Sequence, residues 1–137
     1  MKFPLVSDIA TTLVSYVDIT SSIANALDMM LEQNHRNIIV IDSDCFRVLT
    51  VLDVLQIEKN KICLDIKLSE LNLSKVPEIH KDENVLNTLE FLDNEIEYIC
   101  VVNSDKTLYG LITHTDITTS IDPDTLMDNY RLLDFLK

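Results

Sequence analysis

One short pattern occurs twice in this chain, and the duplication constrains the fold more than any other feature. The stretch Tyr109–Asp116 reads as an apolar strand that ends in a threonine, with an aspartate three residues later at the start of a helix. An earlier strand ends in the same way, because Thr50 and Asp53 match Thr113 and Asp116, 63 residues further on. An internal repeat of this length predicts two copies of one supersecondary unit.

The other elements recur in the same order. Each copy has a helical segment followed by a short run rich in β-branched residues, at 38–42 and at 99–103, which predicts a strand buried on both faces. The first helix has a full amphipathic stripe, formed by Ile23, Ala26, Leu27, Met30 and Leu31. The second has a matching face, formed by Val85, Leu89 and Leu92, with Asp82 or Asn84 as its cap.

Each copy therefore reads as β-α-β-β-α, which places the chain in the mixed α/β (α+β) class. We predict repeats at residues 5–60 and 67–121, packed against each other with pseudo-twofold symmetry, because about 60 residues bury too small a core to be stable alone. Residues 122–137 begin with Asp122-Pro123-Asp124, a typical helix start. We expect a C-terminal helix there, either packed on the domain or leading to an output domain.

These elements, taken in order, resemble a known family. The order Ser-Asp-Ile, Val, Ser-Ile-x-x-Ala-Leu, Ile-Val-Ile-Asp and Val-Leu-Thr-x-x-Asp is similar to a CBS domain, and the copy ending Gly-Leu-Ile-Thr-x-x-Asp is similar to another. Together they resemble a tandem CBS pair, also called a Bateman module, over about residues 5–121. The resemblance implies a regulatory module whose clefts bind AMP, ADP, ATP or S-adenosylmethionine in many members.

The resemblance also implies roles for individual residues. Thr113 and Asp116 would hold the ribose hydroxyls in one cleft, beside the backbone of Gly110 and Ile112. The other ribose pair is Thr50 and Asp53. Two basic residues of the first copy complete the expected ligand set, Arg36 and Arg47.

The first copy departs from the family pattern, because Arg47 stands where Gly110 stands in the second. Glycine allows close backbone approach, so Arg47 either narrows its cleft or contributes a phosphate ligand. We therefore expect Thr113 and Asp116 to mark the better-preserved site.

The chemistry of the motif supports two roles. A carboxylate accepts charge-assisted hydrogen bonds from both hydroxyls of a ribose, and a threonine hydroxyl can donate or accept. An aspartate or threonine before an apolar run is equally a common helix cap. The two roles are compatible, so the pattern alone does not choose between them.

Charge and cysteine content restrict the function further. The formal net charge is −12, with 6 basic and 9 acidic side chains in residues 1–67 against 5 and 14 in residues 68–137. A field of this sign repels nucleic acid and anionic membranes. Three widely spaced cysteines favour reduced thiols in a cytosolic protein over a disulfide framework or a zinc site.

Three functions remain compatible with the sequence, and none of them is catalytic. The leading hypothesis is a regulatory module that binds an adenosine-containing nucleotide in the cleft between the repeats, forms a homodimer through its helices and controls an attached or partner protein. The second is a ligand-free dimerisation or interaction module. The third is a divalent-cation sensor, favoured by the acidic second half.

Overall fold

The computed structural model describes residues 3–93 and 97–120, which form parts of two compact units. Unit 1 comprises residues 1–12 and 77–137, and unit 2 comprises residues 13–76. The expected C-terminal helix at 122–137 lies outside the described residues. Within the described ranges no helix is long and apolar enough to cross a membrane.

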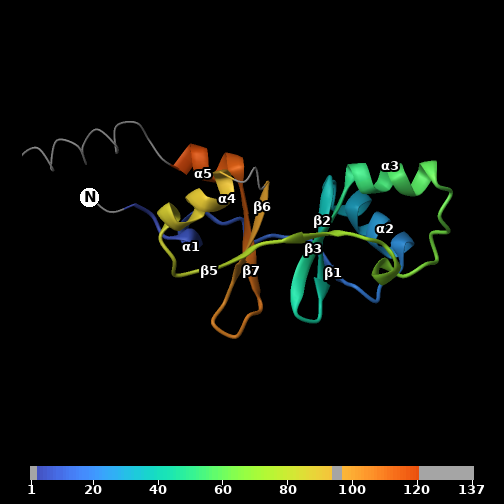
Figure 1. The fold of residues 1–137 in the computed structure, drawn as a ribbon, viewed down its shortest axis with the longest axis horizontal. Coiled ribbons are helices and arrows are strands. Elements are labelled where there is room, and N and C mark those ends of the chain that lie inside the picture. The colour runs from blue at the N-terminus through green and yellow to red at the C-terminus, as the bar shows by residue number, and fades with distance from the viewer. Residues whose placement is uncertain (1–2, 94–96, 121–137) are drawn as a thin grey trace, which may run out of the picture. The chain divides into compact units, whose positions relative to one another are not determined.

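Unit 2 is a four-stranded sheet with helices (Figure 1). Its elements are β1 (Tyr16–Asp18), α2 (Ile23–Gln33), β2 (Asn37–Asp42), β3 (Cys45–Thr50), α3 (Val51–Lys59), the 3-10 helix η1 (Leu68–Glu70) and β4 (Ser74–Val76). The strand order is β1-β2-β3-β4, with β1 parallel to β2 and the other pairs antiparallel. Helices α2 and α3 both contribute to one hydrophobic core.

Helix α2 confirms most of the predicted amphipathic stripe. The Ser22 hydroxyl caps it by accepting the Asn25 N–H, and the stripe's inner residues Ile23, Ala26 and Met30 are buried. The prediction for Leu31 was wrong, because this side chain is 79% exposed. At about 100° per residue, Leu31 lies on the margin of the stripe rather than at its centre.

Unit 1 has a three-stranded sheet and shorter helices. Its elements are α1 (Val6–Ile9), β5 (Glu78–His80), the 3-10 helix η2 (Val85–Thr88), α4 (Leu89–Asp93), β6 (Tyr98–Val102), β7 (Leu108–Thr113) and α5 (His114–Ser120). The strand order is β5-β6-β7, with β5 parallel to β6 and β7 antiparallel to it.

The helical segment of the second copy differs from the prediction. Asn84 is its cap, and its side chain accepts the Leu86 N–H. The segment begins as a 3-10 helix, which has about three residues per turn, so Val85 and Thr88 face inward together and are buried. The prediction that Leu89 lies on the buried face was wrong, because half of this side chain is exposed. The side chain of Leu92 lies outside the described residues.

The predicted core strands are confirmed. Residues 38–40 of β2 and 99–102 of β6 are all buried, so successive side chains on both faces of each strand are shielded from water. This burial explains why both strands are continuous apolar runs without alternation. The mixed α/β class is likewise confirmed, because each unit combines a small sheet with helices.

The compact units do not coincide with contiguous sequence copies. In unit 1, the N-terminal segment packs beside α5 and β7. The fully buried Val6 donates its N–H to the Glu83 carbonyl at 2.8 Å, and Thr11 exchanges two 2.9 Å backbone hydrogen bonds with Leu111. In unit 2, the matching segment supplies η1 and then β4, which pairs with β3. Each unit is thus completed by the opening segment of the other sequence copy.

Candidate functional site

The two Thr-x-x-Asp motifs form the same hydrogen-bonded junction. In unit 2, the Thr50 N–H and hydroxyl both donate to Asp53 Oδ2, at 2.8 and 3.0 Å, and the Asp53 N–H donates back to the Thr50 hydroxyl at 3.3 Å. In unit 1, the corresponding distances between Thr113 and Asp116 are 2.9, 3.0 and 3.3 Å. The two junctions therefore have the same geometry.

This geometry is a capping box. Thr50 has extended backbone angles, φ −108° and ψ 171°, and its side chain satisfies an N–H of the first turn of α3, which has no partner within the helix. Each box uses only one carboxylate oxygen, Oδ2, and leaves Oδ1 outside the box. The structure thus establishes the capping role for both motifs, and among the described residues Oδ1 of each aspartate has no hydrogen-bond partner, so it can accept from a further donor, such as a ribose hydroxyl.

Gly110 stands where the N-terminal segment approaches β7 most closely. A Cβ at this position would lie 2.6 Å from the Thr11 carbonyl oxygen and 3.3 Å from the Ala10 Cβ. The close backbone approach expected at this glycine is therefore made by the chain itself. The presence of Gly110 is explained by the packing of unit 1 and does not by itself indicate a ligand.

Arg47, at the equivalent position of unit 2, is engaged within its own unit. Its Nε donates to Asp42 Oδ2 at 3.0 Å, and its Nη1 donates to the Leu73 carbonyl at 2.8 Å. The guanidinium therefore joins the end of β2 to the chain just before β4. Its role as a phosphate ligand stays a prediction.

The remaining predicted ligand residues lie in different surroundings. Ile112 is fully buried in the core of unit 1, so only its backbone is available to a ligand. Arg36 is exposed just before β2, whose first residue, Asn37, pairs directly with Thr50. Arg36 thus belongs to the same end of the unit 2 sheet as the Thr50 junction. Its neighbour His35 is also exposed and shares a 2.9 Å hydrogen bond with the Ser15 hydroxyl.

A hollow of about 300 Å³ in unit 2 includes Asp53 in its wall. Its polar lining comes from Asp53 and Gln56 of α3, from Asn60 directly after the helix, and from Glu70 and Asn72. Its apolar lining comes from Ile57, Ile62, Leu71 and Leu73. The three carboxamides were not predicted from the sequence, although the spacing of 53, 56 and 60 on a predicted helix is a usable signal.

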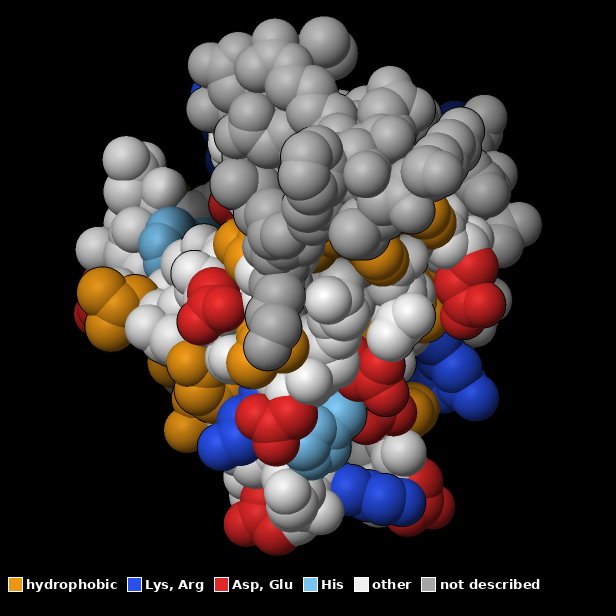
Figure 2. Space-filling view, turned by 90° about the vertical axis from the view of Figure 1, so that its left-hand side faces the viewer, with side chains coloured by type: hydrophobic (Ala, Val, Ile, Leu, Met, Phe, Trp, Pro, Cys, Tyr) orange, Lys and Arg blue, Asp and Glu red, His pale blue; other side chains and the backbone are white. Residues whose placement is uncertain are grey.

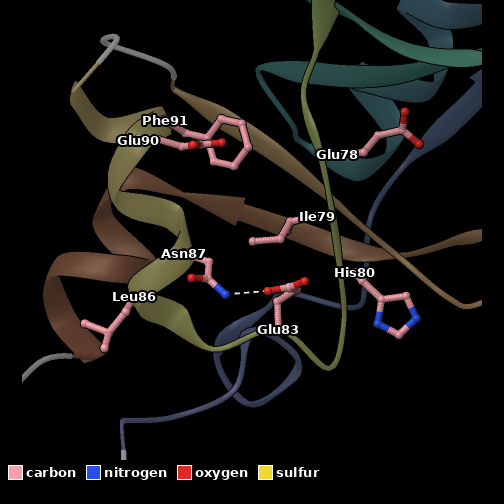
Figure 3. Close-up of a pocket in the computed structure, with 8 residues that line it drawn as sticks. All are labelled: Glu78, Ile79, His80, Glu83, Leu86, Asn87, Glu90 and Phe91. Carbon is pink, nitrogen blue, oxygen red and sulfur yellow. Dashed lines mark hydrogen bonds between the residues drawn. The ribbon is translucent and has the colours of Figure 1, made fainter.

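A larger hollow of about 510 Å³ lies in unit 1, between β5 and the segment η2–α4 (Figure 3). Ile79 and Phe91 provide apolar lining, while Glu78, Glu83 and Glu90 make its surroundings acidic. The Glu83 carboxylate accepts a hydrogen bond from the Asn87 amide. No motif residue lines this hollow, and its charge disfavours a phosphate group.

The buried cysteine is unreactive, and the described residues contain no cluster that could hold a metal ion. Burial, reinforced by the nearby Glu78 carboxylate, raises the pKa of the Cys100 thiol to about 12, so this thiol is protonated and unreactive near neutral pH. No group of three or more His, Cys, Asp or Glu residues within 3–93 and 97–120 is arranged to hold a metal ion.

Comparison with known proteins identifies both repeats. The family model described as "CBS domain" matches residues 6–60 and again residues 68–123. An uncharacterized 17.7 kDa protein of Acidianus ambivalens is 28% identical over 119 residues, which cover 85% of this chain and 72% of that protein.

Solved structures show the same fold. A CBS domain-containing protein of unknown function from Bacillus anthracis superposes with a TM-score of 0.69 at 20% identity, covering 85% of this chain and 91% of that one. The structure of CBSX2 in complex with AMP has a TM-score of 0.66 at 20% identity, covering 85% of this chain and 94% of that one.

Proposed function

This chain belongs to the CBS domain family, with two CBS domains in tandem, and we propose that it is a non-catalytic regulatory module that binds an adenosine-containing ligand through its Thr-x-x-Asp junctions. CBS domain pairs are generally regulatory and ligand-binding, and one structural neighbour was solved with AMP. Binding would control an attached or partner protein by favouring one of two conformations.

The observation that carries the proposal is the spare carboxylate oxygen at each junction. Asp53 and Asp116 cap their helices with Oδ2 alone, so Oδ1 can accept a ribose hydroxyl without opening the cap. A cap needs only one acceptor, and the second oxygen supplies the charge-assisted bond that a ribose requires.

Of the two junctions, we propose Thr50 and Asp53 as the primary site. The hollow beside Asp53 combines a carboxylate, carboxamides and apolar side chains, a composition typical of small-molecule sites. Its volume of about 300 Å³ is at the lower end of the range for such sites. Gly110 was the reason to expect the better-preserved site at Thr113 and Asp116, but the close approach of the Thr11 backbone explains this glycine without a ligand.

The charge of this hollow narrows the ligand class. Two of its lining residues, Asp53 and Glu70, are carboxylates, and the whole chain carries a formal charge of −12. Each added phosphate therefore raises the cost of binding. We propose an adenosine ligand with little negative charge, AMP or the positively charged S-adenosylmethionine, in preference to ATP.

Isothermal titration calorimetry of the full chain with AMP, S-adenosylmethionine and ATP tests the proposal. Asp53→Asn keeps an oxygen that can accept the cap hydrogen bonds but removes the charge, and Asp116→Asn is the matched variant in unit 1. A hydrogen bond to a charged group contributes about 1.5–3 kcal/mol, so Asp53→Asn should weaken binding about 10- to 150-fold, with Asp116→Asn close to wild type. The 2′,3′-dideoxy analogue of AMP should lose affinity for wild type to a similar degree.

Other outcomes select other functions. If Asp53→Asn and the dideoxy analogue both bind as tightly as their parents, the ribose role is wrong. A ligand at 100 times its dissociation constant adds about 2.7 kcal/mol of stability, so a thermal-shift screen detects occupancy independently. Stabilisation by magnesium alone would support a cation sensor, and no stabilisation by any compound would support a ligand-free interaction module.

A further inference from the structure

In the described part of unit 1, β5 is an edge strand. The sheet order is β5-β6-β7, so β5 pairs with β6 along one side only. The Pro77 carbonyl accepts the N–H of Cys100 in β6 at 2.9 Å, and the bonding groups of a strand alternate in direction from one residue to the next. The backbone N–H and C=O groups of Glu78 and His80 therefore face away from β6.

Three of these four backbone groups are available to another chain. The His80 carbonyl already accepts the Glu83 N–H at 3.0 Å, which closes this end of the edge. The Glu78 N–H, the Glu78 carbonyl and the His80 N–H have no hydrogen-bond partner among the described residues. An open strand edge can pair with an extended segment of a second chain through such groups.

The open edge borders the hollow of about 510 Å³ between β5 and η2–α4. Figure 3 shows Ile79 directed into this hollow and Glu78 on the opposite side of β5. An added strand would likewise direct every second side chain into the hollow. A lysine or arginine there would pack its hydrocarbon stem against Ile79 and Phe91. Its charge would then lie beside the carboxylates of Glu83 and Glu90, which also line the hollow.

Unit 2 shows that the fold does not require this acidic lining. The capping residues Ser22 and Asn84 follow the first strand of each repeat at the same distance, so a shift of 62 residues aligns the two segments. At this shift the three glutamates of the hollow correspond to one aromatic, one hydroxyl and one acidic side chain, Tyr16, Ser21 and Asp28. Two of the three negative charges are therefore particular to unit 1.

We propose that the open edge of β5 and the hollow beside it bind a short extended segment of a basic partner protein. This surface, called here the β5 groove, consists of Glu78–His80, Glu83, Glu90 and Phe91. The segment adds a strand to the sheet of unit 1, and lysine or arginine at every second position provides its specificity. No residue of the two Thr-x-x-Asp junctions lines the hollow, so this proposal does not depend on the proposed ligand.

The distribution of charge favours a basic partner over a second copy of this chain. Unit 1 carries 5 basic and 14 acidic side chains, whereas unit 2 carries 6 and 9. Acidic side chains are spread over the face shown in Figure 2, which looks onto unit 1. Two such edges would repel each other, because like charges on opposing strands destabilise the pairing. The same field attracts a basic segment.

Titration of the isotope-labelled full chain with acetyl-Arg-Val-Arg-Val-Arg-amide at low salt, followed by nuclear magnetic resonance, tests the proposal. We expect saturable binding in which the Glu78 and His80 amides shift and exchange their hydrogens at least tenfold more slowly. The fully N-methylated peptide keeps the charges but loses the backbone donors, so it should bind at least fivefold more weakly. Absence of binding, unchanged amides at both positions, or equal binding of the N-methylated peptide overturns the proposal.

Matched variants separate the β5 groove from the overall charge. Glu78→Gln/Glu83→Gln removes two charges from the groove and keeps an oxygen that can accept the Asn87 amide. Asp28→Asn/Glu32→Gln removes two charges from exposed positions of α2 in unit 2. We expect the first pair to weaken peptide binding at least fivefold and the second less than twofold. An equal effect of both pairs overturns the proposal, as does spermidine binding as tightly as the peptide, which would indicate a site for small cations.

Discussion

Substituting alanine for Gly110 tests how the N-terminal segment completes unit 1. The new Cβ would lie 2.6 Å from the Thr11 carbonyl oxygen, which is a backbone atom and cannot rotate away. An ordinary contact begins near 3.4 Å, so the segment must retreat by about 0.8 Å. The two 2.9 Å hydrogen bonds between Thr11 and Leu111 would then exceed the normal range of about 2.7–3.2 Å.

Two independent estimates of the cost agree. Overpacking a well-packed site costs about 1–3 kcal/mol, and two weakened backbone hydrogen bonds of about 0.5–1.5 kcal/mol each give the same range. Alanine also lowers the conformational entropy of the unfolded chain, which offsets about 0.4–1 kcal/mol of this cost. We therefore expect Gly110→Ala to lower the free energy of unfolding by about 1–2 kcal/mol.

Urea denaturation measures this loss, and hydrogen exchange shows where it arises. The amides of Thr11 and Leu111 should exchange faster in the variant, whereas amides of β2 and β3 in unit 2 should keep their protection and serve as an internal control. A variant as stable as wild type, with protected Thr11 and Leu111 amides, would refute the close approach and with it the packing explanation for Gly110.

Three further predictions follow from single interactions. Thr50→Val and Thr113→Val each remove a cap hydroxyl and should lower the free energy of unfolding, measured by urea denaturation, by about 0.5–2 kcal/mol. The two losses should be similar because the two boxes have the same geometry, and a loss at only one junction would contradict that equivalence. Arg47→Met removes the donors to Asp42 and to the Leu73 carbonyl, so it should lower the free energy of unfolding by about 1–3 kcal/mol and speed amide exchange in unit 2. Unchanged stability would show that these bonds contribute little. Burial raises the pKa of the Cys100 thiol from its usual value of 9.0 to about 12, so its contribution to stability is complete below pH 9 and falls by about 1.4 kcal/mol per pH unit between pH 9 and pH 12. Cys100→Ala should lack this part of the alkaline slope in pH-dependent denaturation.

The sequence predicted the repeated elements because each leaves a local signal. The continuous apolar runs of β2 and β6 predicted buried strands, and the spacing of Ile23, Ala26 and Met30 predicted the inner face of α2. Errors occurred where a side chain lies at the edge of a pattern, as at Leu31, or where the helix type changes the spacing, as at Leu89.

The exchange of opening segments could not be predicted from local patterns. Thr11 pairs with Leu111, far along the chain, and no periodicity reports such a contact. One residue did carry a signal, since Gly110 permits a close backbone approach, but the sequence alone could not say whether a ligand or the chain itself makes that approach.

The candidate site was predictable in its shared geometry and not in its surroundings. A threonine followed three residues later by an aspartate was compatible with a helix cap as well as with ligand binding, and the structure has a capping box at both junctions. The Leu73 carbonyl that accepts from Arg47 and the Asn72 carboxamide of the hollow both belong to the segment 70–73, which leads into β4, the strand paired with β3. Long-range packing therefore determines what distinguishes the two junctions.

Helix α3 begins at the Thr50–Asp53 junction, so a ligand bound at the junction should change the stability of this helix. A ligand that bonds to Asp53 Oδ1 adds to the cap and stabilises the first turn, which contains Val51 and Leu52. By thermodynamic linkage, a ligand that stabilises the capped helix must bind the capped helix more tightly by the same factor. Amide hydrogen exchange in α3, measured with and without saturating AMP or S-adenosylmethionine, tests this coupling. Unchanged exchange would mean that the ligand does not act on the cap, whereas slower exchange that disappears in Asp53→Asn would show that the bond to Asp53 stabilises α3.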